Sequence, residues 1–596
     1  MEEQEQANNQ TSNSRPPRLT IVWTVLVFAA ITLLTLGVDW INDEAGIQPG
    51  MINILKIILV ALTVIFWFFW LMFFSRHRYR YLIAPVIASL FMLFFYLFRI
   101  VFDGDMGFVR VEPRFNDRQF KPVATETLSS NAVNLNVTGD NDFNQFLGND
   151  QRDSTIVNRV LNTDWELNPP KIVWRQEVGE GWSGFAAVNG FAVTQEQRGA
   201  DECVTCYDIA TGDLKWIYTA ARRHEDQMSM GKVGPRATPT IHNSMVYVQG
   251  ATGVLECLNG SDGTLVWKQN IPEILGTEMT TLVSMQGLEY AFEETTKSTL
   301  AWGRSGSPLI YKDNVIATGG VKQDGSKVTL IAFNKHDGTE SWRGGTDMIS
   351  YGSPAITNLL GRQQLTILAE SAAIVMNPDN GNVIWRVARK GHSNMDANTT
   401  QITRINNNQI LLTKGYGLGG ELVELKSENG NTDSNTIWKS ARVLKTKMMS
   451  PVILNGHAYC LSDGFLECCD LGGEGQEPRR KWRKRGRFGN GQLLLVGDKL
   501  LVHTENGVLK LVEASPDKYT ELAEFKTIDG VCWNTLCLYE NYLLVRSELE
   551  AACIELKLDT QAASNGYSVE PPDEMNKDEA PEQPQLPSNT GSDIDE

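Results

Sequence analysis

The sequence of 596 residues lacks the motifs of conventional hydrolases and phosphate-binding enzymes. It contains no Gly-x-Ser-x-Gly elbow, no glycine-rich phosphate loop and no His-Glu-x-x-His helix. Histidine is scarce, and none of the seven histidines stands at metal-ligand spacing from another. A net charge of −17 offers no broad basic surface to a polyanion. We therefore expect no catalytic residue of these kinds, no metal site and no nucleic-acid partner.

Cysteine occurs nine times, but neither of its close pairs carries a complete metal or redox motif. Cys203 and Cys206 have the spacing of such motifs, yet Tyr207 stands where haem attachment needs histidine. Positions three apart on a strand also point to opposite faces. The neighbouring pair Cys468 and Cys469 falls in a predicted strand. We favour core packing for both pairs, with a functional disulfide at the neighbouring pair as the alternative.

What recurs is a tryptophan that follows a glycine turn. Residues 208–216 contain this frame, and it returns at 259–267, 334–342 and 377–385, each time after a short apolar strand. The basic spacing of the closing aromatic residues is 42 to 44 residues. We expect these aromatic side chains to dock one repeat onto the next. They are Trp174, Trp216, Trp267, Trp342, Trp385, Trp438, Trp482 and Phe525.

A repeat of this length holds four short strands with their turns, which is the content of one propeller blade. Eight closing aromatics predict an all-β eight-bladed propeller with four-stranded antiparallel blades. Ser-Pro or Thr-Pro pairs begin at residues 238, 307, 353 and 450, and proline suits the start of an innermost strand because it lacks the ladder donor. Residues 171–178 have no blade before them, and the last strand, 552–556, has no partner after it. The two should pair and close the ring.

The frame formed by Asp208, Thr211, Gly212 and Trp216 resembles the tryptophan docking motif of eight-bladed quinoprotein propellers. The resemblance covers residues 141–558 and extends to pyrroloquinoline-quinone-like repeat proteins that keep the fold without a proven cofactor. Among these is the propeller lipoprotein group of the outer-membrane barrel-assembly machinery. The motif is specific for the fold and carries little information about activity.

Three apolar stretches open the chain, at residues 19–38, 57–74 and 81–98, and each is long enough to span a bilayer. No small-residue cleavage site follows the first, so an anchor is favoured over a cleaved signal peptide. Basic residues precede the first stretch and fill the loop between the second and third, which predicts that these ends face the cytoplasm. We expect a multi-pass protein of the bacterial cytoplasmic membrane with its propeller on the periplasmic side.

The composition divides the chain into five predicted regions. Residues 1–18 form a cytoplasmic N-terminus, 19–102 a three-helix transmembrane anchor, and 103–140 a polar linker that lets the ring stand off the membrane. Residues 141–558 form the propeller. Residues 559–596 are acidic, contain several prolines and are predicted to be disordered.

A channel mouth is expected near the starts of the innermost strands. Arginines there would bind an anionic group through their planar set of donors. In the alternative interpretation, Glu196 and the arginines pair with one another and join neighbouring blades. The candidate mouth residues are Trp182, Ser183, Glu196, Arg198, Arg236, Arg304, Tyr351 and Asn490.

The leading hypothesis is a noncatalytic scaffold or binding module for envelope proteins or polymers, with no cofactor. One alternative is a membrane-bound quinoprotein dehydrogenase that holds pyrroloquinoline quinone (PQQ) and calcium and passes electrons to a quinone. The propeller portion of about 420 residues is shorter than in those enzymes, and their catalytic aspartate and calcium ligands map onto no particular positions of this chain. A second alternative is a ligand sensor. A channel filled by aromatic and aliphatic side chains would favour the scaffold, and a pocket of converging acidic and amide groups would favour a cofactor.

Overall fold

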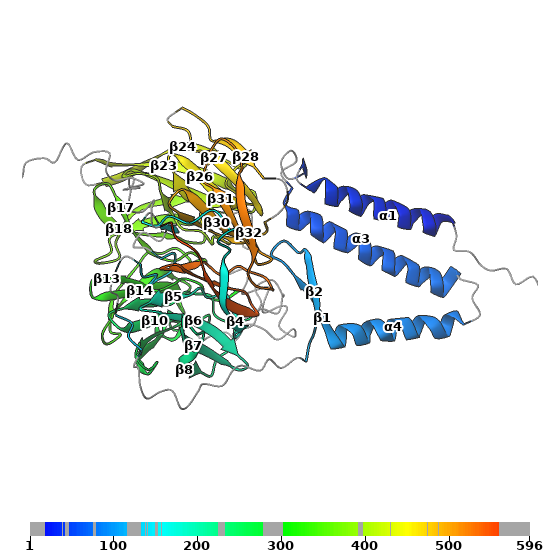
Figure 1. Ribbon diagram of the computed structural model, residues 1–596, viewed down its shortest axis with the longest axis horizontal. Coiled ribbons are helices and arrows are strands. Elements are labelled where there is room, and N and C mark those ends of the chain that lie inside the picture. The colour runs from blue at the N-terminus through cyan, green and yellow to red at the C-terminus, as the bar shows by residue number, and fades with distance from the viewer. Residues whose placement is uncertain are drawn as a thin grey trace, which may run out of the picture.

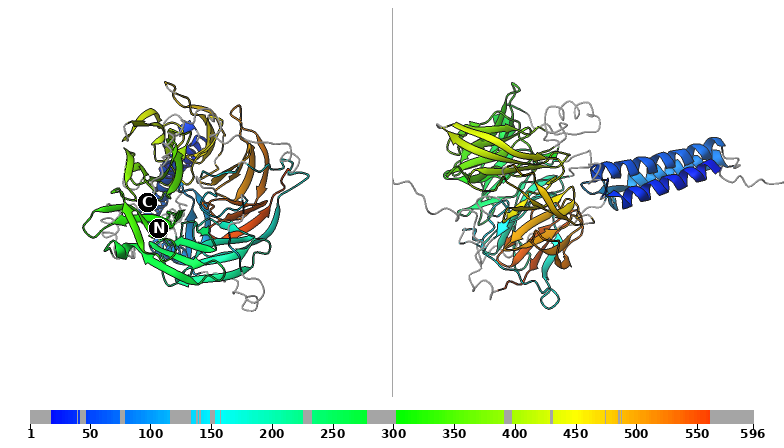
Figure 2. Two further views of the ribbon diagram at one scale, coloured as in Figure 1. Left: turned by 90° about the vertical axis from the view of Figure 1, so that its left-hand side faces the viewer. Right: turned by 90° about the horizontal axis from the view of Figure 1, so that it is seen from above.

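Eight antiparallel sheets stand in a ring, and three helices project from one face of it (Figure 1). The ring is seen along its axis in the left view of Figure 2. In this computed structural model the described residues are 18–38, 40–41, 47–74, 79–115, 133–136, 139, 141–148, 153–156, 158–224, 233–277, 302–390, 397–428, 431–473, 475–484, 486 and 488–559. The predicted acidic tail, apart from Asp559, and most of the predicted cytoplasmic N-terminus lie outside the described residues.

Each blade is a four-stranded sheet whose strands follow one another from the channel outward. Blade 1 comprises β5 (Ala186–Val188), β6 (Phe191–Arg198), β7 (Asp201–Asp208) and β8 (Leu214–Ala220); blade 2, β9 (Thr240–His242), β10 (Met245–Gln249), β11 (Val254–Asn259) and β12 (Leu265–Asn270); blade 3, β13 (Leu309–Tyr311), β14 (Asn314–Val321), β15 (Lys327–Asn334) and β16 (Glu340–Gly344); and blade 4, β17 (Ala355–Leu359), β18 (Arg362–Leu368), β19 (Ala372–Met376) and β20 (Val383–Ala388). Blade 5 comprises β21 (Thr403–Arg404), β22 (Gln409–Lys414), β23 (Gly419–Glu428) and β24 (Asn431–Ser440); blade 6, β25 (Val452–Leu454), β26 (His457–Ser462), β27 (Phe465–Asp470) and β28 (Arg479–Arg483); blade 7, β29 (Gln492–Val496), β30 (Lys499–His503), β31 (Val508–Glu513) and β32 (Glu521–Lys526); and blade 8, β33 (Cys537–Tyr539), β34 (Tyr542–Arg546), β35 (Glu550–Glu555) and β4 (Lys171–Glu177). The predicted eight-bladed propeller is therefore confirmed.

The ring closes through the strand that comes earliest among the blade strands. β4 pairs antiparallel with β35, and Lys171 lies opposite Glu555 at one end of the ladder while Glu177 lies opposite Glu550 at the other. This pairing covers the edge of the last blade, which would otherwise expose unpaired backbone groups. The closure predicted from the sequence is confirmed.

Within the described residues, the repeated tryptophan holds a blade to the next one by an indole hydrogen bond at five of the eight docking positions. The indole N–H of Trp174 donates to the carbonyl oxygen of Ile209 at 2.7 Å, and that of Trp216 donates to Gly260 at 2.9 Å. The turn glycine is needed for two reasons. Gly263 has a φ of +74°, and a Cβ atom there would come within 2.6 Å of the Trp216 ring. Trp267, Trp438 and Trp482 make the same type of bond with the following blade, at 2.7 to 3.0 Å.

The Ser-Pro and Thr-Pro pairs form a second set of links between blades, close to the ring axis. The hydroxyl oxygen of Ser307 accepts a hydrogen bond from the backbone N–H of Thr238 at 2.9 Å, and that of Ser353 accepts from Ser307 at 3.0 Å. Gly184 donates to Thr238 in the same way. In all four pairs the innermost strand begins directly after the proline, as predicted. These hydroxyls thus accept hydrogen bonds from backbone N–H groups that lie before the innermost strands, where no neighbouring strand can accept them.

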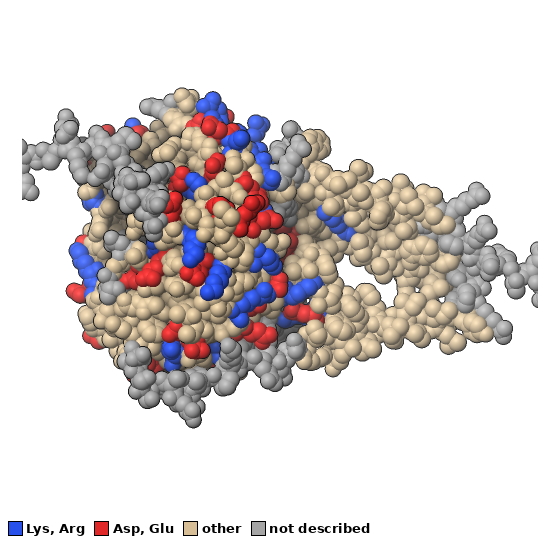
Figure 3. All heavy atoms as spheres, in the orientation of Figure 1, with Lys and Arg blue, Asp and Glu red and all other residues tan. Residues whose placement is uncertain are grey.

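Helices form in all three apolar stretches: α1 (Arg18–Leu36), α3 (Pro49–Phe69), extended by a π-helical turn η2 (Trp70–Phe74), and α4 (Arg80–Leu97). Of the described residues, only 49–73 make a helix long and apolar enough to cross a membrane, and 21–36 and 81–97 are shorter apolar helices. The prediction of three transmembrane helices is thus supported by length and composition for one. Figure 3 shows almost no charged side chain on the visible surface of the helices, whereas both signs of charge are interspersed over the ring.

The chain does not leave the helices as a stand-off tether. β1 (Phe98–Phe102) continues directly from α4 and pairs with β2 (Phe108–Pro113), and we call this unit, residues 98–113, the anchor hairpin. Its tip is a tight turn in which Asp103 accepts hydrogen bonds from the backbone N–H groups of Asp105 and Gly107, at 2.9 and 2.7 Å. The predicted linker therefore begins with ordered structure that lies against the ring (Figure 1). Residues 116–132 of that linker lie outside the described residues.

A second N-terminal segment lines the channel itself. Phe143 exchanges backbone hydrogen bonds with Ala187 of β5, and Asn144 accepts one from Ile241 of β9. Further along, β3 (Thr155–Ile156) pairs in parallel with β29 on the inner edge of blade 7. Residues 141–148 and 155–156 therefore use the free inner edges of three blades.

Candidate functional site

The loops that lead into the innermost strands all lie at the same end of the channel. The innermost strands occupy equivalent places in eight similar blades, so their starting ends meet at one face of the ring. The anchor hairpin contacts residues of these loops, including Glu180 before β5 and Asn490 before β29. We therefore call this end the helix-side mouth. The opposite face, formed by the turns after the innermost strands and by the docking turns, is called the far face.

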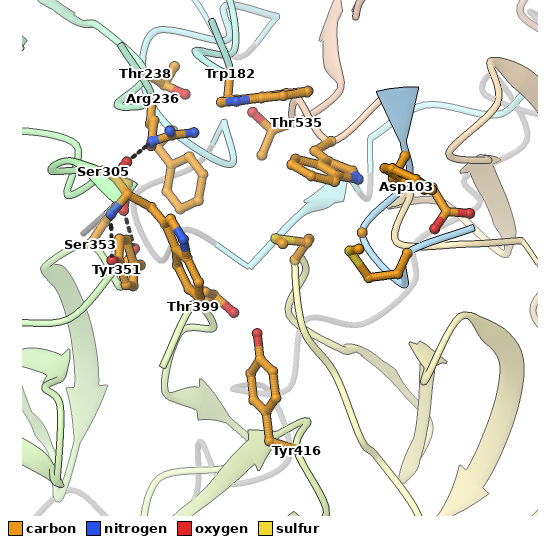
Figure 4. Close-up of a pocket in the computed structure, with 17 residues that line it drawn as sticks. Asp103, Trp182, Arg236, Thr238, Ser305, Tyr351, Ser353, Thr399, Tyr416 and Thr535 are labelled. Atoms are coloured by element: carbon orange, nitrogen blue, oxygen red, sulfur yellow. Dashed lines mark hydrogen bonds between the residues drawn. The ribbon is translucent and has the colours of Figure 1, made fainter. Parts of the chain in front are cut away.

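A cavity of about 380 Å³ occupies the helix-side mouth (Figure 4). Its lining consists of seven aromatic side chains, two methionines, seven polar side chains and Gly104. The anchor hairpin supplies part of the wall through residues 102–104 and 106, and Phe146 of the luminal segment supplies another part. Within the described residues, no leucine, isoleucine or valine lines it, although such residues fill the blade cores.

Two aromatic pairs stand in this lining. Trp302 and Tyr351, from the loops into blades 3 and 4, lie with ring centroids 5.4 Å apart and planes inclined by 33°. Trp182 and Trp533, from the loops into blades 1 and 8, lie 4.4 Å apart at 30°. The blade order places the two pairs on different sides of the channel. Such offset pairs hold one another rigidly and leave ring faces and edges toward the cavity.

The tip of the anchor hairpin is fixed by buried charges. The carboxylate of Asp105, 2% exposed, pairs with Lys447 at 2.8 Å and accepts a bond from Asn490 at 3.3 Å. The backbone N–H of Gly104 donates to Glu505 at 2.9 Å. Gly104 has no room for a side chain, since a Cβ atom there would lie 2.6 Å from the Asn490 amide nitrogen. The tip therefore fits one place on the mouth, between blades 6 and 8.

The surroundings of this contact disfavour the charged form of Glu505 and favour the charged form of Lys447. Burial, with further repulsion from Asp103 and Asp105, raises the pKa of Glu505. Burial alone would lower the pKa of Lys447, but the carboxylates of Asp105 and Asp463 more than offset it and raise that pKa above its ordinary value. Lys447 is therefore the positive centre around which the acidic hairpin tip is held.

Hydrogen bonds also tie α3 and β2 to the same region. Asn53 of α3 donates its side-chain amide to the Asp105 carbonyl oxygen at 2.8 Å. Arg110 of β2 bonds to Glu548 of blade 8 at 2.9 Å. The helices and the ring are therefore connected through a folded contact in addition to the chain itself.

The eight predicted mouth residues occupy different places. Trp182, Arg236 and Tyr351 line the cavity, and Arg236 also donates to the carbonyl oxygen of Trp302. Asn490 contacts the hairpin tip. The other four are Ser183, Glu196, Arg198 and Arg304, which do not line the cavity.

Glu196 takes part in a buried network that joins blades. Its carboxylate pairs with Arg198 at 2.9 Å and accepts from Tyr207 at 2.6 Å. Burial opposes ionisation, but Arg198 and Arg546 outweigh it and hold the pKa of Glu196 below its ordinary value. Arg546 of blade 8 donates to the carbonyl oxygens of Gln195 and Gly179 at 2.7 and 2.8 Å. This geometry agrees with the interpretation that these charges join blades across the closing seam.

Several site residues were absent from the sequence-based set. Trp302 and Trp533 belong to no docking frame, and Lys447 and Glu505 carried no spacing signal. One signal was available, because Trp302, Trp533 and Lys447 each lie shortly before an innermost strand. Glu505 lies in the turn between β30 and β31. The hairpin tip was missed because a five-residue turn in a polar region has no apolar periodicity.

The lining does not fit a cofactor of the PQQ and calcium type. PQQ carries three carboxylates, and the part of the cavity lining that the structure describes offers one cationic side chain, Arg236. Its one carboxylate, Asp103, already accepts two N–H groups of its own turn. Across the described residues, no cluster of three histidine, cysteine or carboxylate side chains could hold a metal ion. The Cys468–Cys469 pair lies on β27, away from the cavity lining.

All nine cysteines are buried free thiols. Burial raises the pKa of Cys203, Cys257 and Cys553 to about 12, so these groups stay protonated and unreactive near neutral pH.

We expect the native protein in detergent to resist a maleimide at pH 7.5, and nine thiols to react after unfolding without reductant. A cysteine placed at the exposed Ser341 serves as the control for reagent access and should react at once. Fewer than nine reactive thiols in the unfolded, unreduced protein would show a disulfide and contradict this assignment.

Comparison with known proteins gives one family. A family model described as outer membrane protein assembly factor BamB matches residues 166–286 and 227–515. No curated protein matches the chain. BamB from Moraxella catarrhalis is 13% identical with a TM-score of 0.43, over 65% of this chain and 99% of that one. Quinohemoprotein alcohol dehydrogenase from Comamonas testosteroni is 13% identical with a TM-score of 0.47, over 70% and 81%. At these values the structural likenesses do not bear on function.

Proposed function

Because this chain belongs to the family described as outer membrane protein assembly factor BamB, we propose that it is a noncatalytic scaffold for proteins or polymers of the bacterial envelope. In this function the ring is a rigid scaffold that presents its loops to a partner, and it needs no cofactor. The family match, which spans residues 166–515, supports the scaffold but does not name a partner.

We propose that α1, α3 and α4 all cross the cytoplasmic membrane. Only the α3 region meets the length criterion alone, but α1 and α3 contact each other, and Trp67 donates to Thr24 across that contact at 3.0 Å. Large apolar side chains on all three helices are exposed, such as Phe28, Phe69 and Leu90 at 73%, 52% and 60%. Exposed apolar surface on this scale is costly in water and favourable in lipid.

The observation that carries the proposal is the anchor hairpin in the helix-side mouth. It fixes the ring to the helices through Lys447, Asn490 and Glu505, so the channel end that faces the helices faces the bilayer. The far face then points away from the membrane, where a partner can reach it. Loops on a rigid scaffold are common recognition surfaces.

In-cell photo-crosslinking tests this orientation. A photoreactive residue at Ala210 or at His336, both exposed in docking turns of the far face, should capture envelope partners reproducibly. The same residue at Val383, 45% exposed on the outermost strand β20, is the matched control and should capture much less. Equal patterns at all three positions would contradict a partner surface on the far face.

Membrane topology is tested separately with cysteine variants and a membrane-impermeant maleimide on intact spheroplasts. Ser341→Cys should react from outside, because three crossings place the ring in the periplasm. A cysteine introduced at position 77, between the second and third apolar stretches, should react only after the membrane is permeabilised. Reaction of both before permeabilisation would rule out the three-span arrangement.

A further inference from the structure

We propose that the cavity of the helix-side mouth binds a saccharide unit of an envelope glycan. The inference rests on the proposed function of the ring as a binding module and names the chemical class of one ligand. It concerns a different surface from the far face, so the two can be tested independently.

The lining has the composition that saccharides require. A pyranose ring presents patches of C–H groups on its faces and hydroxyls around its edge. The aromatic rings of the cavity can pack against the C–H patches, and its polar groups can bond to the hydroxyls. Aromatic and polar residues are equally numerous in the lining. Within the described residues, no branched aliphatic side chain lines it, which disfavours an acyl chain as the ligand. Its volume of about 380 Å³ lies in the range of small-molecule sites.

Several polar groups line the cavity wall. Within the described residues, the hydroxyls of Thr399 and Thr535 have no hydrogen-bond partner in the protein, and both residues are half-buried. Figure 4 shows the Tyr416 hydroxyl pointing toward the centre of the cavity from the side opposite Trp182. Arg236 adds a cationic donor to the lining. Sugar hydroxyls both donate and accept, so they can use all of these groups.

The aromatic walls are preorganised. Trp302 is held by its stacking on Tyr351 and by a hydrogen bond from its backbone N–H to the Tyr351 hydroxyl at 3.2 Å. On the other side, Trp533 donates its indole N–H to Glu505 at 2.6 Å, and Glu505 also holds the anchor hairpin. A ligand therefore meets rings whose positions are already fixed, which lowers the entropic cost of binding.

The location allows two sources of the same chemistry. A soluble oligosaccharide would enter from the periplasm, whereas the headgroup of a glycolipid would arrive from the bilayer toward which the mouth is turned. Both present one or a few sugar units to the cavity. Each source therefore needs its own arm of the experiment.

The test uses saturation-transfer NMR on the full-length protein in detergent, with chitotetraose and cellotetraose as soluble probes. We expect saturation transfer to at least one of them, and affinity about tenfold weaker in Trp302→Ala, because an aromatic wall is lost. Thr399→Val keeps the shape and removes only the hydroxyl, and it should weaken binding about threefold. Tyr542→Ala removes an aromatic ring from the far face and is the control that should bind normally.

For the second source, the protein is placed in nanodiscs with or without monogalactosyl diacylglycerol. If the natural ligand is a glycolipid headgroup, the galactolipid should occupy the cavity and reduce saturation transfer to the soluble probe. If the natural ligand is a soluble oligosaccharide, the galactolipid should leave that transfer unchanged. Circular dichroism and the thermal midpoint show whether Trp302→Ala is folded. Absence of saturation transfer to both probes, with and without the glycolipid, would overturn the proposal, and so would unchanged binding in both cavity variants. In that case photo-crosslinking of partners from the far face would still succeed. The two results together distinguish failure of the saccharide proposal from failure of the scaffold proposal.

Discussion

Replacing Trp216 by alanine is expected to lower the free energy of unfolding of the ring by about 3–5 kcal/mol, as for other large buried aromatics. Trp216 is 3% exposed, packs against the Gly263 turn of the next blade and donates to Gly260. Truncation leaves a cavity between two blades and an unpaired carbonyl oxygen. The measurement is the midpoint of urea unfolding of the ring, monitored by the far-ultraviolet circular dichroism of its β-strands.

Two further variants show whether the destabilisation comes from loss of the docking contact or from loss of any indole side chain. Gly263→Ala probes the same contact from the other blade, since its new Cβ atom would press on the Trp216 ring at a φ of +74°. Trp302→Ala removes an indole from the half-buried cavity and should cost clearly less. If Trp302→Ala and Trp216→Ala destabilise the ring equally, the docking role of the repeated tryptophan is refuted.

Replacing Lys447 by methionine is expected to free the anchor hairpin from the mouth. The change leaves Asp105 buried beside Glu505 without its cation, and loss of one partner of a buried pair costs about 3–5 kcal/mol. Hydrogen exchange should show faster exchange of the hairpin amides, above all that of Gly104, which is bonded to Glu505. The blade amides should keep their protection, because Lys447 lies outside the blade cores.

The matched control is Lys268→Met, an exposed lysine on β12, which should leave exchange in residues 98–113 unchanged. The double variant Asp105→Asn with Lys447→Met should recover part of the protection, because no buried charge then lacks a partner. Unaltered exchange of Gly104 in Lys447→Met would show that the ion pair does not hold the hairpin.

The blades could be predicted because their signal repeats. Trp216 and Gly263 form a docking contact that recurs at four blade junctions in the described residues, and the closing aromatic recurs in every blade, so the period, the number of blades and the pairing of residues 171–177 with the last blade follow from the sequence alone. The prolines at residues 239 and 308 mark innermost strands for the same reason. Repetition turns weak local preferences into a reliable pattern.

The mouth could not be predicted because its contacts occur once and join distant residues. Asp105 and Lys447 are separated by 342 positions, and Gly104 and Glu505 by 401. Neither pair has a spacing rule, and residues 103–107 read as an ordinary polar turn. Glu196 and Arg304 were grouped with the mouth because they lie near strands of the inner region, but their side chains bond within and between blades.

The central claim, that the anchor's own hairpin is seated in the helix-side mouth, is tested most directly by disulfide trapping. Gly104→Cys and Asn490→Cys are combined in one chain, because the Gly104 Cβ position lies 2.6 Å from the Asn490 side chain, and a protease site is inserted between residues 116 and 132. After mild oxidation and cleavage, the account predicts that the anchor and ring fragments stay joined without reductant and separate with it. Pairing Gly104→Cys with Ser341→Cys, with Asn490→Ala added to make the same room at position 104, controls for random collision and should give separate fragments. Separate fragments from the Gly104 and Asn490 pair would contradict the account.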